Sequence, residues 1–137
     1  MQTRDQRYAE KIFEQVSQLL QRPKPEQKQY GSMAHKLPVL IRTAGLAQSL
    51  AFVAASKKAP HQQLLTDLAQ AIAHQTGDQQ IATQLLDKSR TASLGSYMKL
   101  TREALSALLW YKRFAQSVLD VEAGEEPAEN ETTQPQE

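Results

Sequence analysis

The chain has 137 residues, enough for one domain with a continuous hydrophobic core and too few for two ordinary domains. Cysteine is absent, which excludes a disulfide framework, a zinc site built on cysteines and a thiol nucleophile. The charged N-terminal segment lacks the apolar core of a signal peptide, and no apolar run approaches the roughly 18 residues that span a membrane. We therefore expect a single-domain cytoplasmic protein.

The net charge of +1 hides an uneven distribution of charge along the chain. All 16 Lys and Arg precede Glu122, together with only nine Asp and Glu, so residues 1–121 carry a formal charge of +7. Residues 122–137 contain six acids, no base and few apolar side chains, which is typical of disorder. We predict a helical domain over 1–121 and a disordered acidic tail over 122–137. The basic body suits a polyanionic partner, although surface cations also serve solubility alone.

Hydrophobic periodicity predicts helices in the N-terminal half. A first helix is expected over about 4–21, opened by a capping box of Thr3 and Gln6. A second helix is expected to start near Pro25. Pro38 either opens a third helix at its first turn or kinks a longer one.

If the stretch 39–58 is a helix, apolar residues occupy nearly all of its sides, which predicts that it lies in the middle of the bundle. One narrow stripe interrupts this pattern and must face water or a partner. Its members are Arg42, Gly45, Ser49, Phe52 and Ser56.

Three further helices are expected over about 60–76, 79–90 and 97–121, with Gly77 ending the first and Asp78 capping the second. The expected core side of the last helix comprises Met98, Ala104, Leu105, Leu108, Tyr111, Ala115, Val118 and Leu119. No segment alternates as a strand does. The predicted fold class is all-α: one compact bundle of five to six helices.

No pattern of catalytic residues is found in the sequence. The three histidines, His35, His61 and His74, lack the spacing of metal ligands, and the dispersed glycines form no phosphate-binding loop. No serine lies in a nucleophile elbow. We therefore predict no enzymatic activity, no metal and no cofactor.

Basic residues recur on one side of two predicted helices. They are Arg4, Arg7 and Lys11 in the first helix, and Lys99, Arg102 and Arg113 in the last, with Trp110 at the edge of the latter set. Each set of cations could contact phosphates of a nucleic acid. The alternative interpretation is that each set is an ordinary charged helix face in contact with water. Trp110 is either a packing residue or an anchor in a protein contact.

The stretch from Tyr30 to Lys57 resembles one family, the small subunit of the type III-B CRISPR effector, the Cmr complex. The matching features are Tyr30, the Leu37-Pro38 step, Ile41, the Gly45-Leu46 pair and Leu50-Ala51-Phe52. A similar pattern follows in LTREALSALLWYKRFA, residues 100–115. The resemblance covers about a third of the chain, and residues 60–95 and the tail do not share it.

This resemblance implies a non-catalytic subunit that stacks in several copies along the guide RNA and its paired target RNA, beside other Cmr subunits. The motif implies RNA contacts at Lys36 and Arg42, to which charge and helical phase add Lys57, Arg102 and Arg113. Contacts to other subunits are expected at Gly45, Phe52 and Trp110. Head-to-tail stacking requires two different patches on each copy, for which the first helix and the last helix with Trp110 are candidates.

Two other hypotheses stay open at this stage. A helical adaptor would bind protein alone, through the Arg42-Gly45-Ser49-Phe52 stripe and Trp110, and its affinity would depend little on salt. A ribonuclease is a third hypothesis, to be tested with labelled RNA and divalent metal. An RNA contact differs from the adaptor because its affinity falls steeply with salt.

Overall fold

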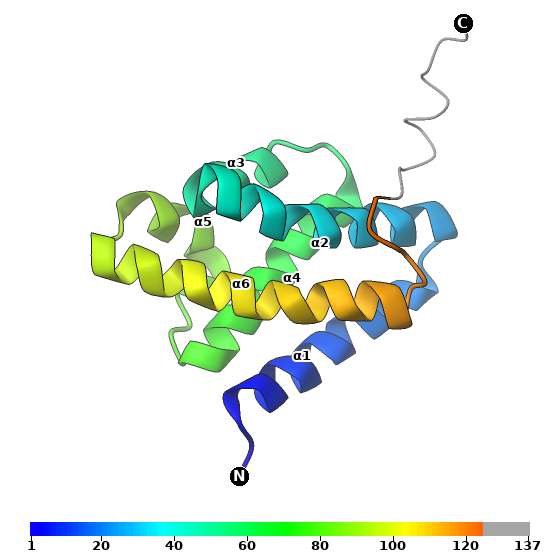
Figure 1. Ribbon diagram of the computed structural model, residues 1–137, viewed down its shortest axis with the longest axis horizontal. Helices are drawn as coiled ribbons and strands as arrows, with labels where there is room; N and C mark the ends of the chain where they lie inside the picture. The colour runs from blue at the N-terminus through cyan, green and yellow to red at the C-terminus, as the bar shows by residue number, and fades with distance from the viewer. Residues whose placement is uncertain (125–137) are drawn as a thin grey trace, which may run out of the picture.

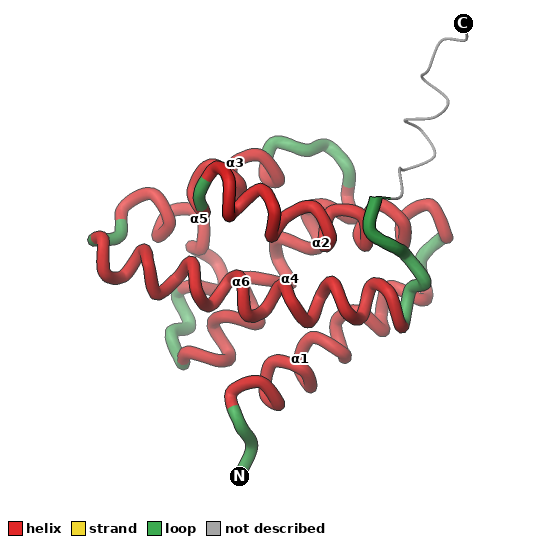
Figure 2. Tube along the Cα trace, viewed as in Figure 1, coloured by secondary structure: helices red, strands yellow, loops and turns green. Residues whose placement is uncertain are grey.

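The computed structural model of the chain describes residues 1–124 as a bundle of six α-helices and one 3₁₀ turn (Figure 1). The elements are α1 (Arg4–Gln18), η1 (Leu19–Gln21), α2 (Lys24–Ala44), α3 (Leu46–Ala54), α4 (Ala59–Thr76), α5 (Ile81–Thr91) and α6 (Leu94–Ser117). No strand occurs within residues 1–124, so the all-α prediction is confirmed (Figure 2). Most of the predicted acidic tail, residues 125–137, lies outside the described residues.

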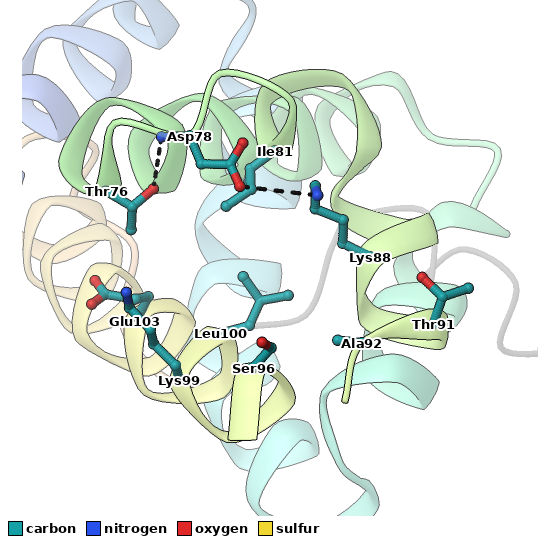
Figure 3. A pocket seen from close by; sticks show the side chains of 10 residues that line it. All are labelled: Thr76, Asp78, Ile81, Lys88, Thr91, Ala92, Ser96, Lys99, Leu100 and Glu103. Atoms are coloured by element: carbon teal, nitrogen blue, oxygen red, sulfur yellow. Dashed lines mark hydrogen bonds and ion pairs between the residues drawn. The ribbon is translucent and has the colours of Figure 1, made fainter. Parts of the chain in front are cut away.

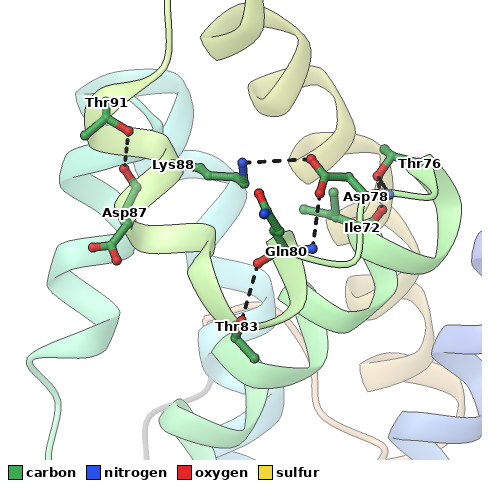
Figure 4. Close-up of polar contacts among 8 residues, drawn as sticks. All are labelled: Ile72, Thr76, Asp78, Gln80, Thr83, Asp87, Lys88 and Thr91. Carbon is green, nitrogen blue, oxygen red and sulfur yellow. Dashed lines mark hydrogen bonds and ion pairs between the residues drawn. The ribbon is translucent and has the colours of Figure 1, made fainter.

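The predicted helix ends at Thr3 and Gly77 are confirmed. Thr3 Oγ1 accepts a hydrogen bond from the Gln6 backbone N–H at 3.0 Å, and Gln6 Oε1 accepts one from the Thr3 N–H at 2.8 Å. α4 ends at Gly77, which has left-handed geometry with φ 80°. Asp78 then accepts a hydrogen bond from the Gln80 N–H at 3.1 Å just before α5 (Figure 4).

α2 continues through Pro38, which is buried inside the helix and does not open a new one. The helix ends instead at Gly45, where φ 89° and ψ 163° lie in a region that side chains exclude. α3 then starts in a new direction. The predicted continuous helix over 39–58 is therefore wrong, and so is its single stripe, because Ser49 is buried while Arg42 and Phe52 are exposed.

The central helix is α4, which packs against α1, α2, α3, α5 and α6 (Figure 1). Leu64, Leu68 and Ile72 of α4 are fully buried. α3 lies at the periphery and exposes Ala51 and Phe52. The expectation that 39–58 occupies the middle of the bundle is wrong because this short, apolar helix is covered on one side only.

α6 lies beside α2 and runs antiparallel to it (Figures 1 and 2). Its core side is confirmed at Ala104, Leu108 and Tyr111, which are fully buried. Met98 is exposed, contrary to the prediction. It precedes the buried Leu100 by two residues, and two residues rotate a side chain by about 200° around a helix.

A buried polar network joins four helices at the centre of the bundle. Asp67 of α4 accepts hydrogen bonds from the Tyr30 hydroxyl at 2.7 Å and from Gln63 Nε2 at 2.8 Å. Gln15 of α1 donates to the Asp67 backbone oxygen at 3.0 Å and accepts from the Tyr111 hydroxyl. Since Tyr30 is fully buried, its place in the family-like motif is explained by this internal bond.

The chain packs against the bundle as far as Val121. Val121 is buried, its N–H donates to the Ala115 oxygen at 2.9 Å, and His35 Nε2 donates to its carbonyl oxygen at 2.9 Å. Gly31 leaves room for it, because a Cβ at position 31 would lie 2.7 Å from the Val121 Cβ. The segment after α6 is thus held against α2 by a hydrogen bond to His35 and by packing on Gly31.

Candidate nucleic-acid interface

Lys36 and Arg42, the two RNA contacts implied by the motif, both lie exposed on α2. They are six residues apart, which separates them by about 120° around the helix axis and about 9 Å along it. Arg42 lies two turns after His35, on the side of α2 that receives the segment after α6, whereas Lys36 points away from that side. An RNA strand that contacts both must therefore cross α2.

Lys57 lies exposed in the loop between α3 and α4, away from the regular helix faces. The neighbouring Lys58 is half-buried, and the Ser56 hydroxyl holds the turn by accepting a hydrogen bond from the Lys58 N–H at 3.2 Å. The Ser56 hydroxyl also bonds His61 Nδ1 at 2.7 Å. The loop is therefore ordered by its own polar residues, and the Lys57 side chain is left at the surface.

Arg102 and Arg113 lie exposed on the same side of α6. Their separation of 11 residues is close to three turns, which places them about 20° apart in phase and about 16 Å apart along the axis. The structure thus brings these two together, as helical phase predicts.

The five predicted RNA contacts share one electrostatic property: none forms an ion pair or a side-chain hydrogen bond with another residue of the described part. Some of the other cations are paired: Arg4 lies 2.8 Å from Glu103, Arg22 lies 2.9 Å from Glu26, and Arg90 pairs with Asp87. Arg7, Lys11, Lys24, Lys99 and Lys112 are unpaired within residues 1–124 as well, so the lack of a partner does not by itself single out Lys36, Arg42, Lys57, Arg102 and Arg113. Their charges remain available to an external anion.

Gly45, predicted as a subunit contact, has an internal role at the α2–α3 break. The Tyr97 hydroxyl of α6 accepts a hydrogen bond from the Ala47 N–H at 3.1 Å, which satisfies a free donor in the first turn of α3. A Cβ at position 45 would lie 3.2 Å from the same hydroxyl oxygen. The geometry of this junction explains the glycine without a partner.

Trp110 belongs to an aromatic cluster that spans α1 and α6. Its ring centroid lies 5.6 Å from that of Phe114, which in turn lies 5.4 Å from Phe13 in an edge-to-face arrangement. Phe13 is half-exposed, although it fits the apolar helical period of α1. The first and last helices therefore meet at this aromatic cluster, and the assignment of the two stacking patches stays a prediction.

A pocket of about 340 Å³ lies between the end of α4, α5 and α6 (Figure 3). Two lysines, Lys88 and Lys99, and two carboxylates, Asp78 and Glu103, line it. Lys88 Nζ lies 3.9 Å from Asp78 Oδ2, an ion pair that is marked by a dashed line in Figure 4. Glu103 is buried and accepts a hydrogen bond from the Tyr8 hydroxyl at 2.6 Å in addition to its pair with Arg4. Glu103 is thus already bound on its α1 side.

Residues 1–124 contain neither a metal-binding cluster nor a membrane-spanning helix. No group of three or more His, Cys, Asp or Glu side chains lies close enough there to hold a metal ion. None of the helices in this part of the chain is long and apolar enough to cross a membrane.

Comparison with known proteins decides the family. A family model described as CRISPR-associated protein (Cas_Cmr5) matches residues 4–118, a range that includes all six helices. The chain belongs to the Cas_Cmr5 family. The resemblance found between Tyr30 and Lys57 is thereby confirmed.

Members of the Cas_Cmr5 family from Thermus thermophilus are similar to this chain over most of its length. A protein named CRISPR system Cmr subunit Cmr5 is 42% identical over 121 residues, covering 88% of this chain and 99% of that protein. The crystal structure of a CRISPR-associated Cmr5 family protein matches with a TM-score of 0.76 and 42% identity, covering 86% of this chain and 98% of that one. The bundle described above is therefore the fold of the family.

Proposed function

We propose that this chain is a non-catalytic small subunit of a type III-B CRISPR (Cmr) ribonucleoprotein in antiviral defence. Its copies stack along the guide RNA and the paired target RNA and contact phosphates through basic surfaces. Membership of the Cas_Cmr5 family supports the subunit role. The observation that supports the RNA contact is the set of exposed, unpaired cations on a body of charge +7, which includes Lys36, Arg42 and Lys57.

The RNA contact is tested by alanine variants of the two motif cations. In a complex reconstituted with Lys36→Ala, Arg42→Ala or both, we expect weaker target RNA binding. The plot of log affinity against log salt should become shallower by roughly 0.7 for each single-strand phosphate that the variant no longer neutralises. Fluorescence anisotropy of labelled target RNA at four salt concentrations measures both quantities. Because the two residues lie on different sides of α2, the single variants also show whether the RNA crosses that helix.

Arg90→Ala is the matched control, because Arg90 is an exposed cation that already pairs with Asp87. It should leave the affinity and the salt dependence unchanged. If the Lys36 and Arg42 variants bind RNA and support target cleavage as the wild type does, the proposed phosphate contacts are wrong.

The alternative function is a helical adaptor that binds protein alone. Phe52 favours it, since this large apolar side chain is 53% exposed on α3. Under this alternative, Phe52→Ala should weaken incorporation into the complex, incorporation should vary little with salt, and the Lys36 and Arg42 variants should have no effect. Quantitative co-purification of tagged variants at two salt concentrations separates the two functions.

Removal of the acidic tail tests whether its charge competes with RNA. A chain ending at Val121 keeps the bonds that fasten this residue to α2, so its free energy of unfolding should change by less than about 0.5 kcal/mol. Its RNA affinity should rise, because six acids no longer compete with phosphates. A full-length chain with these six acids changed to glutamine should bind like the truncated one. Weaker RNA binding by either variant would contradict the competition.

A further inference from the structure

The outer face of α6 carries a row of apolar side chains that nothing in the described chain covers. Leu94 is 75% exposed, Met98 51% and Leu109 47%, and the partly buried Leu105 lies between the last two. The spacing of 4, 7 and 4 residues places all four on one side of the helix, within about 60° of one another. The row is about 22 Å long, which is the length of a helix of about 15 residues.

Exposed cations lie along one side of this row. Arg102 and Arg113 lie exposed about 20–40° beyond Leu109 around the helix, and the half-buried Lys112 lies at the phase of Leu94, past the C-terminal end of the row. The single acid of α6, Glu103, is buried and bound by Arg4 and Tyr8. The outer face of α6 therefore combines aliphatic side chains and positive charge with no negative charge from the helix itself.

This chemistry favours a protein ligand over RNA at α6. Leucine and methionine have no aromatic face on which a base could stack, and phosphate contacts would leave the row exposed to water. An amphipathic helix covers such a row with its own aliphatic side chains at a spacing of three to four residues. Arg102 and Arg113, which the sequence predicts as RNA contacts, then meet carboxylates on the borders of that helix.

We propose that the outer face of α6 is a docking site for an acidic amphipathic helix of a partner protein. Aliphatic side chains of that helix cover Leu94, Met98, Leu105 and Leu109, and its Asp or Glu residues bind Arg102 and Arg113. This site does not depend on the proposed RNA contacts at Lys36, Arg42 and Lys57, because those residues lie on α2 and in the α3–α4 loop.

Binding of two designed peptides to the full chain tests the chemistry of the site. Both are labelled helices of about 18 residues with leucines at the spacing of the row, one with Glu and one with Lys at the bordering positions. We expect the Glu peptide to bind at least about tenfold more tightly by fluorescence anisotropy, and Leu109→Glu to weaken it by a similar factor. Val39→Glu is the control, because it adds the same charge at a similarly exposed apolar residue on α2. Equal binding of the two peptides, or equal effects of the two variants, would overturn the proposal.

A photo-crosslinking amino acid at position 98 in the purified complex identifies the occupant. Crosslinks to a protein segment that carries aliphatic and acidic residues support the proposal, and Leu109→Glu should abolish them. Crosslinks to RNA, to a segment without acids, or to nothing overturn it. Retention of RNA by the same complexes is scored separately, so failure at α6 is distinguishable from failure of the α2 contacts.

Discussion

Replacing Asp67 by alanine should lower the free energy of unfolding by about 3 kcal/mol. The Tyr30 hydroxyl is fully buried and donates to Asp67 at 2.7 Å, so the variant leaves this donor without an acceptor. A buried polar group in that state costs about 1–3 kcal/mol, to which the lost packing of the carboxyl group adds. Urea unfolding followed by circular dichroism measures the change. Tyr30→Phe, which removes the donor together with its need for a partner, should cost less.

The destabilisation should also depend on pH. Burial raises the pKa of Asp67 above its ordinary value of 3.8, although hydrogen bonds from Tyr30 and Gln63 oppose the shift. The folded protein then binds this proton more tightly than the unfolded chain does. The stability that this tighter proton binding contributes is fully present below the pKa of Asp67 in the unfolded chain. It is lost as pH rises through the pKa of Asp67 in the folded protein.

The difference in stability between wild type and Asp67→Ala should therefore widen as pH falls from about 7 towards about 4, because the variant has no proton to bind at this site. Unfolding of both proteins at four pH values in this range gives the difference directly. A difference that narrows as pH falls would mean that the hydrogen bonds to the carboxylate outweigh its burial.

Replacing Gly45 by alanine should cost about 2–3 kcal/mol and loosen the junction between α2 and α3. The backbone at Gly45 lies where a side chain costs about 1–3 kcal/mol. The added Cβ would also lie 3.2 Å from the Tyr97 hydroxyl oxygen, which accepts the hydrogen bond from the Ala47 N–H. Denaturant unfolding measures the decrease in stability.

Gly77→Ala is the control for this change. Gly77 also ends a helix with positive φ, but its left-handed conformation costs other residues only about 1–2 kcal/mol, and no atom lies within 4 Å of an added Cβ. Gly45→Ala should therefore be the more destabilising of the two. Tyr97→Phe in the Gly45→Ala background should not restore stability, because it leaves the backbone strain in place. Full rescue would show that the contact with the hydroxyl is the whole cause.

The family and the helical class were predictable because their signals are local. The capping box at Thr3, the stop at Gly77 and the apolar period of the first helix depend on neighbours within a few residues. The family motif includes Tyr30, Pro38 and Gly45, which the fold places in a buried hydrogen bond, a buried helix interior and a helix break. At Gly45 the residue type contributed to the family match, but the sequence did not predict the backbone conformation. A glycine within an apolar run is compatible both with a continuous helix and with a helix break.

The exposure of apolar residues in α1 and α6 was not predictable from periodicity. Phe13 and Met98 both fit an apolar helical stripe, yet both are about half exposed. A stripe gives the direction of the core side, but its width depends on how many neighbouring helices cover it. α6 packs against α2 and α1, but no helix of the described chain covers Leu94, Met98 and Leu109. A side chain at the edge of the apolar stripe is therefore exposed to solvent.

Residue order alone was sufficient to specify the helical periods, the helix ends at Thr3 and Gly77, the family and the separation of a basic body from an acidic C-terminal segment. These properties follow from spacing, backbone preference and charge. Four other properties emerged only from the folded chain: the central place of α4, the burial of Asp67 against Tyr30, the divergence of Lys36 and Arg42 around α2, and the uncovered apolar row of α6. The physical reason is that burial and side-chain pairing depend on contacts between helices far apart in sequence, which no local pattern encodes.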